Sequence, residues 1–165
     1  MSSASTSPYA LTRVLMVCMG NICRSPTAQG VLEHLAQQHG LQASITVDSA
    51  GTHSYHIGHA PDARSQQHAQ ARGYDLSAQR ARQLQRQDFT DFDWVLVMDA
   101  GNEALARQLC PPEHQHKIRL LASFCQKHTA HEVPDPYYGG ADGFEVVLDL
   151  CEDACAGFLR HLQQQ

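Results

Sequence analysis

Four short apolar runs, separated by segments with helical character, constrain the fold of this chain more than any other feature. The runs occupy residues 13–17, 44–50, 94–99 and 117–121. Each has the length of a buried strand, and the segments between them carry apolar residues at helical spacing or helix-ending signals. Strands that alternate with helices pair in parallel, because the helix returns the chain to the same end of the sheet. The alternation therefore predicts an α/β fold of the doubly wound class, with helices on both faces of the sheet.

The helices are expected between and after these strands. We expect the first helix to begin with Ser25 as its hydroxyl cap and to end at Gly40. Further helices are expected over residues 61–73, after Asp99 as a cap, and from Phe144 onwards. In sheets of this class ligands bind beyond the carboxyl ends of the strands. The loop that follows the first apolar run is therefore the first place to look for a site.

Composition limits the partners and the compartment. The chain has 165 residues, 42% of them hydrophobic, with a formal net charge of -5 and a pI near 6.1. Scattered charge and the absence of a basic stripe predict no nucleic-acid partner and no membrane partner. The Ser/Thr-rich residues 1–10 are expected to form a disordered tail without a signal peptide, followed by one domain over residues 11–165. With six cysteines expected to be reduced thiols, the sequence predicts a cytoplasmic protein.

The loop "CMGNICRS", which begins at Cys18, carries the chemistry. A loop that joins a strand to a helix directs backbone N–H groups and the positive end of a helix dipole at one spot, which suits a phosphate and a thiolate. Gly20 and Asn21 tolerate the backbone angles that let such a loop curl. Arg24 offers two planar donors to phosphoryl oxygens, and Ser25 can donate its hydroxyl to the sulfur. Cys18 is therefore the candidate nucleophile for a phosphate monoester.

A second segment, "VPDPYYGG", supplies an acid. Asp135 stands between two prolines, which fix the backbone and direct the carboxyl, so it can protonate a leaving group. Tyr137 and Tyr138 follow and can form the aromatic wall of a cleft.

At these residues the sequence resembles the low-molecular-weight protein tyrosine phosphatase family. The matching pieces are "CMGNICRS", "DSAGT", "GHAPDARS", "RARQL", "DWVLVMD" and "DPYYGG", in the family's order. The resemblance implies a single domain with a four-stranded, flavodoxin-like parallel sheet, the phosphotyrosine phosphatase I-like fold. It implies hydrolysis of protein phosphotyrosine and small aryl phosphates through a phosphocysteine, with no metal and no other cofactor. The expected partners are phosphotyrosine-containing proteins, and the expected state is a monomer or weak homodimer.

Roles carry over onto matching positions. Cys18 would be the nucleophile, Arg24 the phosphoryl clamp, Asp135 the general acid and later the base, and Ser25 an aid to thiolate departure. The residues expected to bind phosphate, support the loop or line the substrate slot are Met19, Gly20, Asn21, Ile22, Cys23, Ser49, Tyr55, Tyr137 and Tyr138. Cys23 would also form a reversible disulfide with oxidised Cys18.

Two positions depart from the family pattern. Gln79 stands where members often carry a histidine in the network around Asn21 and Ser49. Because an amide also forms hydrogen bonds, we expect the network to be retuned rather than lost. Tyr55 stands where animal members often carry tryptophan, which affects substrate preference.

Other interpretations are less favoured. Cys18, Cys23, Cys151 and Cys155 have spacings that suit zinc, but the last two fall on the apolar face of the final helix and are explained as core. His53, His56 and His59 could bind a metal, although a polar rim beside the cleft explains them better.

Three other functions compete with hydrolysis. A thiol-dependent arsenate reductase needs a relay of further cysteines, and residues 51–109 contain none. A phosphotyrosine-binding module without activity does not need both Cys18 and Asp135. A flavin-binding protein would rest on the fold alone and leaves Cys18 with Arg24 unexplained.

Overall fold

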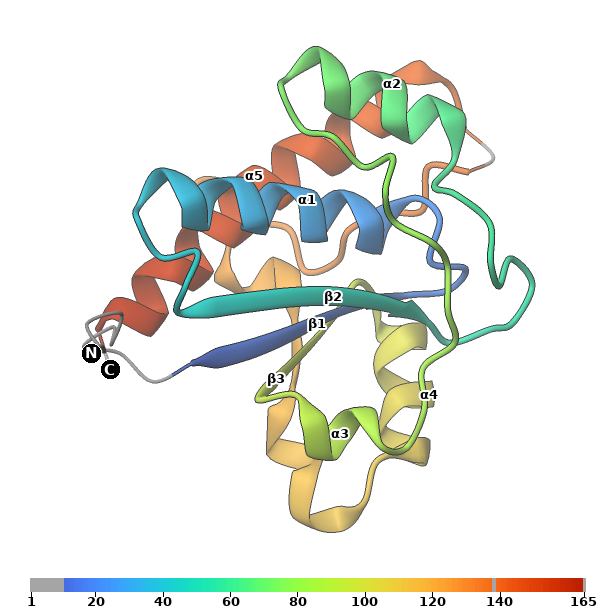
Figure 1. Cartoon of the computed structure of the whole chain (residues 1–165). Helices are drawn as coiled ribbons and strands as arrows, with labels where there is room; N and C mark the ends of the chain where they lie inside the picture. Colours follow the sequence, from blue (N-terminus) through green and yellow to red (C-terminus); the bar gives the residue numbers. More distant parts are fainter. Residues whose placement is uncertain (1–10, 138, 165) are drawn as a thin grey trace, which may run out of the picture.

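The sheet is parallel, four-stranded and covered by helices on both faces (Figure 1). The structure, a computed structural model, describes residues 11–137 and 139–164. Its elements are β1 (Thr12–Cys18), α1 (Arg24–Gln38), β2 (Ile45–Gly51), α2 (Ala63–Ala71), α3 (Asp88–Asp91), β3 (Trp94–Val97), α4 (Ala100–Leu109), the 3-10 helix η1 (Pro112–Lys117), β4 (Ile118–Leu120), the 3-10 helix η2 (Leu121–Phe124) and α5 (Ala141–Gln163). The strand order is β2-β1-β3-β4. The predicted α/β class and four-stranded parallel sheet are confirmed.

Strand β1 lies at the centre of the sheet and feeds both halves of the core. Val14 and Met16 pack into the cluster formed with α1 and α5. Leu15 and Val17 point to the other face, where they join Phe89 of α3 and residues of α4. All four β1 side chains are fully buried. A strand that is apolar on both sides is what a doubly covered parallel sheet requires.

The first helix begins differently from the prediction. Helix α1 starts at Arg24, and the expectation that Ser25 caps it is wrong. The Ser25 hydroxyl instead lies 3.1 Å from the Cys18 sulfur and accepts a hydrogen bond from the Asn21 side chain. The predicted end is confirmed, since Gly40 has φ +70°, a left-handed angle that suits glycine.

Other boundaries shift by a few residues. Strand β3 ends at Val97, before the predicted 99, because Asp99 is drawn into the cap of α4 and accepts a hydrogen bond from the Asn102 amide at 2.7 Å. Helix α5 begins at Ala141, three residues before the predicted Phe144. The short elements α3, η1 and η2 lack a repeating apolar pattern and were not predicted from sequence.

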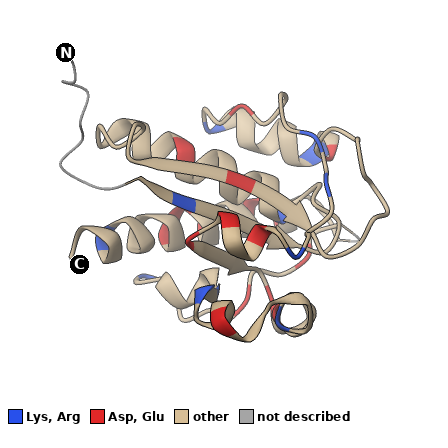
Figure 2. Ribbon diagram, turned by 60° about the horizontal axis from the view of Figure 1, so that its bottom comes forward, with Lys and Arg blue, Asp and Glu red and all other residues tan. Residues whose placement is uncertain are grey.

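Both layers of helices carry acidic and basic residues (Figure 2). No helix within residues 11–137 or 139–164 combines the length and apolar character needed to cross a bilayer. The tail predicted over residues 1–10 lies outside the described residues.

Candidate active site

The site is built on the loop of residues 18–25, which joins the end of β1 to the start of α1 and is called the Cys18 loop below. Asn21 has φ +59°, a left-handed angle that turns the chain back on itself. Its backbone amide consequently donates to the Cys18 sulfur at 3.3 Å. The Ser25 hydroxyl lies 3.1 Å from the same sulfur. The loop thus places a backbone amide and a hydroxyl against the sulfur.

The Asn21 side chain holds the loop in this curled form. Its amide nitrogen donates to the hydroxyls of Ser25 at 2.8 Å and Ser49 at 2.9 Å, while its oxygen accepts from the Arg82 backbone amide at 2.9 Å. Asn21 is buried, so each of these bonds is shielded from water. The sequence-based expectation that Asn21 and Ser49 belong to one network agrees with these contacts, and both support the loop from behind.

Gln79 extends the network to the helix. The Ser49 hydroxyl donates to the Gln79 side-chain oxygen at 3.5 Å, and the Gln79 nitrogen donates to the Pro26 carbonyl at 3.0 Å. The Gln79 side-chain amide therefore links β2 to α1 through these two hydrogen bonds.

Gly51 brings β2 against the Cys18 loop. The two residues that follow it bind the loop. The Thr52 amide donates to the Cys18 carbonyl at 2.9 Å, and the His53 amide donates to the Met19 carbonyl at 3.0 Å. A β-carbon at Gly51 would lie 2.7 Å from the Met19 carbonyl oxygen. Only glycine allows so close an approach, which is the physical reason for the glycine in "DSAGT".

Arg24 is a buried cation with fixed direction. It is 2% exposed, and its Nη1 donates to Asp99 Oδ2 at 2.6 Å and to the Val133 carbonyl at 3.1 Å. Burial opposes the charge, but the Cys18 sulfur and the Asp99 carboxylate outweigh it and raise the pKa of Arg24 above its ordinary value. Asp99 was predicted only as a helix cap. Its second role is visible in the sequence as an acidic residue just beyond the carboxyl end of a central strand.

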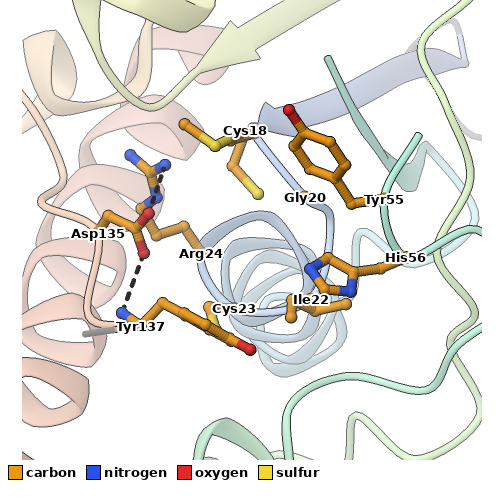
Figure 3. Close-up of a pocket in the computed structure, with 10 residues that line it drawn as sticks. Cys18, Gly20, Ile22, Cys23, Arg24, Tyr55, His56, Asp135 and Tyr137 are labelled. Carbon is orange, nitrogen blue, oxygen red and sulfur yellow. Dashed lines mark hydrogen bonds and ion pairs between the residues drawn. The ribbon is translucent and has the colours of Figure 1, made fainter. Parts of the chain in front are cut away.

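Asp135 lies beside Arg24, across the pocket from Tyr55 and His56 (Figure 3). One of its oxygens accepts from the Tyr137 amide at 3.0 Å, and the other lies 3.7 Å from Arg24 Nη2. The side chain is 37% exposed, so water reaches the carboxyl.

These side chains open on one pocket (Figure 3). Its lining residues are Cys18, Met19, Gly20, Ile22, Cys23, Arg24, Tyr55, His56, Asp135 and Tyr137. Met19 and Tyr55 are exposed at the mouth, where the Tyr55 ring stacks on His53 at 5.1 Å. His56 was predicted on a polar rim beside the cleft, and it lines the pocket itself. The predicted wall residue Tyr138 lies outside the described residues.

The structure also shows the surroundings of the other cysteines and bears on the metal sites that the sequence suggested. Burial raises the pKa of the Cys23 thiol to about 12, partly offset by a hydrogen bond from Ser65. Cys151 and Cys155 are fully buried among apolar side chains, which confirms them as core. Within residues 11–137 and 139–164, no group of three or more His, Cys, Asp or Glu side chains is placed to hold a metal ion.

A parallel α/β sheet whose central strand ends in a loop from cysteine to arginine, with a carboxyl in the same pocket, is the arrangement expected of a cysteine-dependent phosphatase. The family described as low molecular weight phosphotyrosine protein phosphatase matches residues 13–165. The chain belongs to this family, and the resemblance inferred from sequence is confirmed.

Similar proteins cover nearly the whole chain. A putative low molecular weight protein-tyrosine-phosphatase of Synechocystis is 44% identical over 154 residues, 93% of this chain and 98% of the relative. A crystal structure of a protein tyrosine phosphatase from Entamoeba histolytica is 40% identical with a TM-score of 0.91, covering 93% of this chain and 97% of that one. A Drosophila protein described as an arginine phosphatase is 37% identical with a TM-score of 0.81, covering 90% of this chain and 96% of that one.

Proposed function

We propose that this chain hydrolyses phosphotyrosine in proteins, and small aryl phosphates, through a phosphocysteine on Cys18 and without a metal ion. The observation that carries the proposal is that the Cys18 sulfur, the Arg24 guanidinium and the Asp135 carboxyl line one pocket. The proposed nucleophile, phosphoryl clamp and acid can therefore all reach one phosphoryl group bound in this pocket. Family membership supports phosphotyrosine as the substrate class.

In the first step the Cys18 loop receives the phosphoryl group. Backbone amides and Arg24 hold its oxygens, which compensates the charge that a metal ion would otherwise compensate. The Cys18 thiolate attacks phosphorus, and the bond from phosphorus to the tyrosyl oxygen breaks. Asp135 gives its proton to that oxygen, so tyrosine leaves as the neutral phenol and Asp135 becomes a carboxylate.

In the second step water displaces the enzyme from phosphorus. The Asp135 carboxylate takes a proton from the attacking water, the sulfur–phosphorus bond breaks, and inorganic phosphate is formed. The returning Cys18 thiolate is stabilised by the Ser25 hydroxyl at 3.1 Å and the Asn21 amide at 3.3 Å. Asp135 ends the cycle protonated, as it began.

The walls of the pocket favour an aromatic leaving group. Met19, Ile22, Tyr55 and Tyr137 present apolar or aromatic surface, on which a phenyl ring can stack. The apolar and aromatic surface supports tyrosine as the substrate residue, and phosphoarginine is the alternative to be compared in the test.

The direct test is hydrolysis of p-nitrophenyl phosphate, phosphotyrosine peptide and phosphoarginine in the presence of a metal chelator. We expect activity on the first two, little on the third, and a covalent phosphoenzyme trapped by rapid quenching. Loss of activity on chelation, or activity retained by Cys18→Ser, would contradict the mechanism. Asp135→Asn should lose much more activity on phosphotyrosine than on p-nitrophenyl phosphate, since the better leaving group needs less help from an acid.

We further propose that the protein works in the cytoplasm as a monomer or weak homodimer. All six cysteines are free thiols, which suits a reducing compartment. Cell fractionation tests the compartment, and sedimentation velocity over a range of concentrations tests the oligomeric state.

A further inference from the structure

Arg64, in the first turn of α2, makes an unusual set of contacts for a surface arginine. Its Nε and Nη2 donate to the two oxygens of Asp62 at 3.1 and 2.9 Å. Its Nη2 also donates to the Tyr137 carbonyl at 3.1 Å. The guanidinium carbon lies 5.4 Å from the centre of the Tyr137 ring and 4.8 Å from that of Phe144. One side chain therefore ties the start of α2 to the segment that carries Asp135.

The start of α2 is itself fastened to the Cys18 loop. The Asp62 amide donates to the Ile22 carbonyl at 2.8 Å. Arg64 follows this anchor by two residues. Any position that it imposes on Tyr137 is thus defined relative to the loop that holds the nucleophile.

Tyr137 transmits this position to Asp135. Its backbone amide donates to Asp135 Oδ1 at 3.0 Å, which leaves Oδ2 as the oxygen nearer to Arg24. The distance from Oδ2 to Arg24 is 3.7 Å, too long for a hydrogen bond to fix the carboxyl from that side. The direction of the partly exposed carboxyl therefore depends on where the backbone of Tyr137 lies.

We propose that Arg64 is a positioning residue for the general acid: held by Asp62, it fixes Tyr137 so that the Asp135 carboxyl points over the Cys18 loop. This inference rests on the proposed function, in which Asp135 protonates the leaving tyrosine. Arg64 acts through Tyr137 and needs no contact with the reacting atoms.

The contacts require an arginine rather than a general cation. A planar guanidinium can bind both oxygens of Asp62, reach the Tyr137 carbonyl and lie against two ring faces at once. A lysine at position 64 retains the charge but lacks this geometry. We therefore expect Arg64→Lys to recover only part of what Arg64→Gln loses.

The helix should survive the substitution. Asp62 caps α2 through the backbone amides of residues 64 and 65, which remain in any variant at position 64. Arg64 is also 44% exposed, so its removal leaves no large cavity. Thermal unfolding and far-ultraviolet circular dichroism verify this for each variant.

The experiment compares two leaving groups. A displaced acid costs most when the leaving group is poor, so Arg64→Gln should lower kcat/KM on a phosphotyrosine peptide roughly tenfold, a part of the hundredfold or more that a general acid contributes. The ratio kcat/KM is the readout because it reports the first step and not the hydrolysis of the phosphocysteine, which both substrates share. On p-nitrophenyl phosphate kcat/KM should stay within about twofold of wild type, because that leaving group needs little protonation. Arg107→Gln is the matched control, since Arg107 is 41% exposed, pairs with Glu103 and lies in α4. It should change neither value.

A second background separates positioning from a general structural effect. The side chain introduced by Asp135→Asn can still accept a hydrogen bond from the Tyr137 amide, but it has no proton to give to the leaving group. Arg64→Gln added to Asp135→Asn should therefore cause no further loss on phosphotyrosine. Equal losses on the two substrates, or the same loss in the Asp135→Asn background, would overturn the proposal. If Arg64→Gln unfolds below the assay temperature, Arg64→Lys measured in the same way decides. Activity retained by Cys18→Ser would instead refute the proposed function itself.

Discussion

Replacing Gly51 with alanine should disable the Cys18 loop while leaving the sheet intact. Gly51 pairs with Cys18 in the register of β2 and β1. Its new β-carbon would lie 2.7 Å from the Met19 carbonyl oxygen, 3.0 Å from the Gly20 carbonyl carbon and 3.1 Å from the Asn21 amide nitrogen. All three are backbone atoms of the loop and cannot rotate away. Restoring the shortest of these contacts to an ordinary 3.4 Å moves the loop by about 0.7 Å.

The size of the effect follows from that displacement. A misplacement of about 1 Å costs roughly a hundredfold in rate, so we expect kcat/KM on p-nitrophenyl phosphate to fall about 30- to 100-fold, or about 2–3 kcal/mol of transition-state stabilisation. The affinity for inorganic phosphate, measured as a competitive inhibition constant, should weaken as well. Stability should fall as well, because the contact with three backbone atoms outweighs the small entropy gain from removing a glycine, so kcat/KM is expressed per folded molecule.

A second glycine provides the control. At Gly157 an added β-carbon would meet the Phe124 carbonyl oxygen in the contact between α5 and η2, away from the pocket. Gly157→Ala should therefore lower the thermal unfolding midpoint but keep kcat per folded molecule. If Gly51→Ala retains kcat/KM within about twofold of wild type, the reasoning from close approach is refuted.

Three further predictions concern supporting residues. After peroxide converts the Cys18 thiolate to a sulfenic acid, the Cys23 thiol is expected to form a disulfide with it and release water. Cys23→Ser should therefore recover less activity with a thiol reductant than wild type. Equal recovery would refute this prediction. Gln79→Leu removes two hydrogen bonds behind the loop and should cost about 1–2 kcal/mol of stability and several-fold in kcat, measured by urea unfolding and steady-state kinetics. Burial opposes the charge of Asp153, but backbone amides and His128 hold its pKa well below the ordinary range. This stabilisation is present above about pH 4 and declines as pH falls, so Asp153→Asn should be less stable at pH 7 and lose less on acidification.

The main architecture was predictable because burial dictates the pattern of apolar residues along strands and helices. Strands β1 and β3 are apolar on both faces, and a parallel sheet between two helical layers accounts for that pattern. The 3-10 helices and α3 were not predictable in this way, since elements of four to six residues contain too few turns to show a period.

Within the site, residues with one role were easier to predict than residues with two. Cys18, Arg24 and Asp135 were predicted as pocket residues, and all three line it. Ser25 and Asp99 both stand where a helix begins, and a cap was predicted for each. Ser25 was also predicted to contact the Cys18 sulfur, and it makes that contact but not the cap. Asp99 is a cap and also binds Arg24, a contact that depends on tertiary distance, which sequence spacing does not contain.

The contacts that hold Arg24 have a consequence for the synthesis and folding of the enzyme. Its partners, the Asp99 carboxylate and the Val133 carbonyl, lie 75 and 109 residues further along the chain. During synthesis Cys18 leaves the ribosome long before the groups that orient the arginine and before Asp135, the proposed acid. A partly made chain therefore carries the proposed nucleophile without the contacts that direct Arg24 toward a phosphate. Recovery of activity during refolding should accordingly report the last docking of residues 133–137 and not the earlier formation of the sheet.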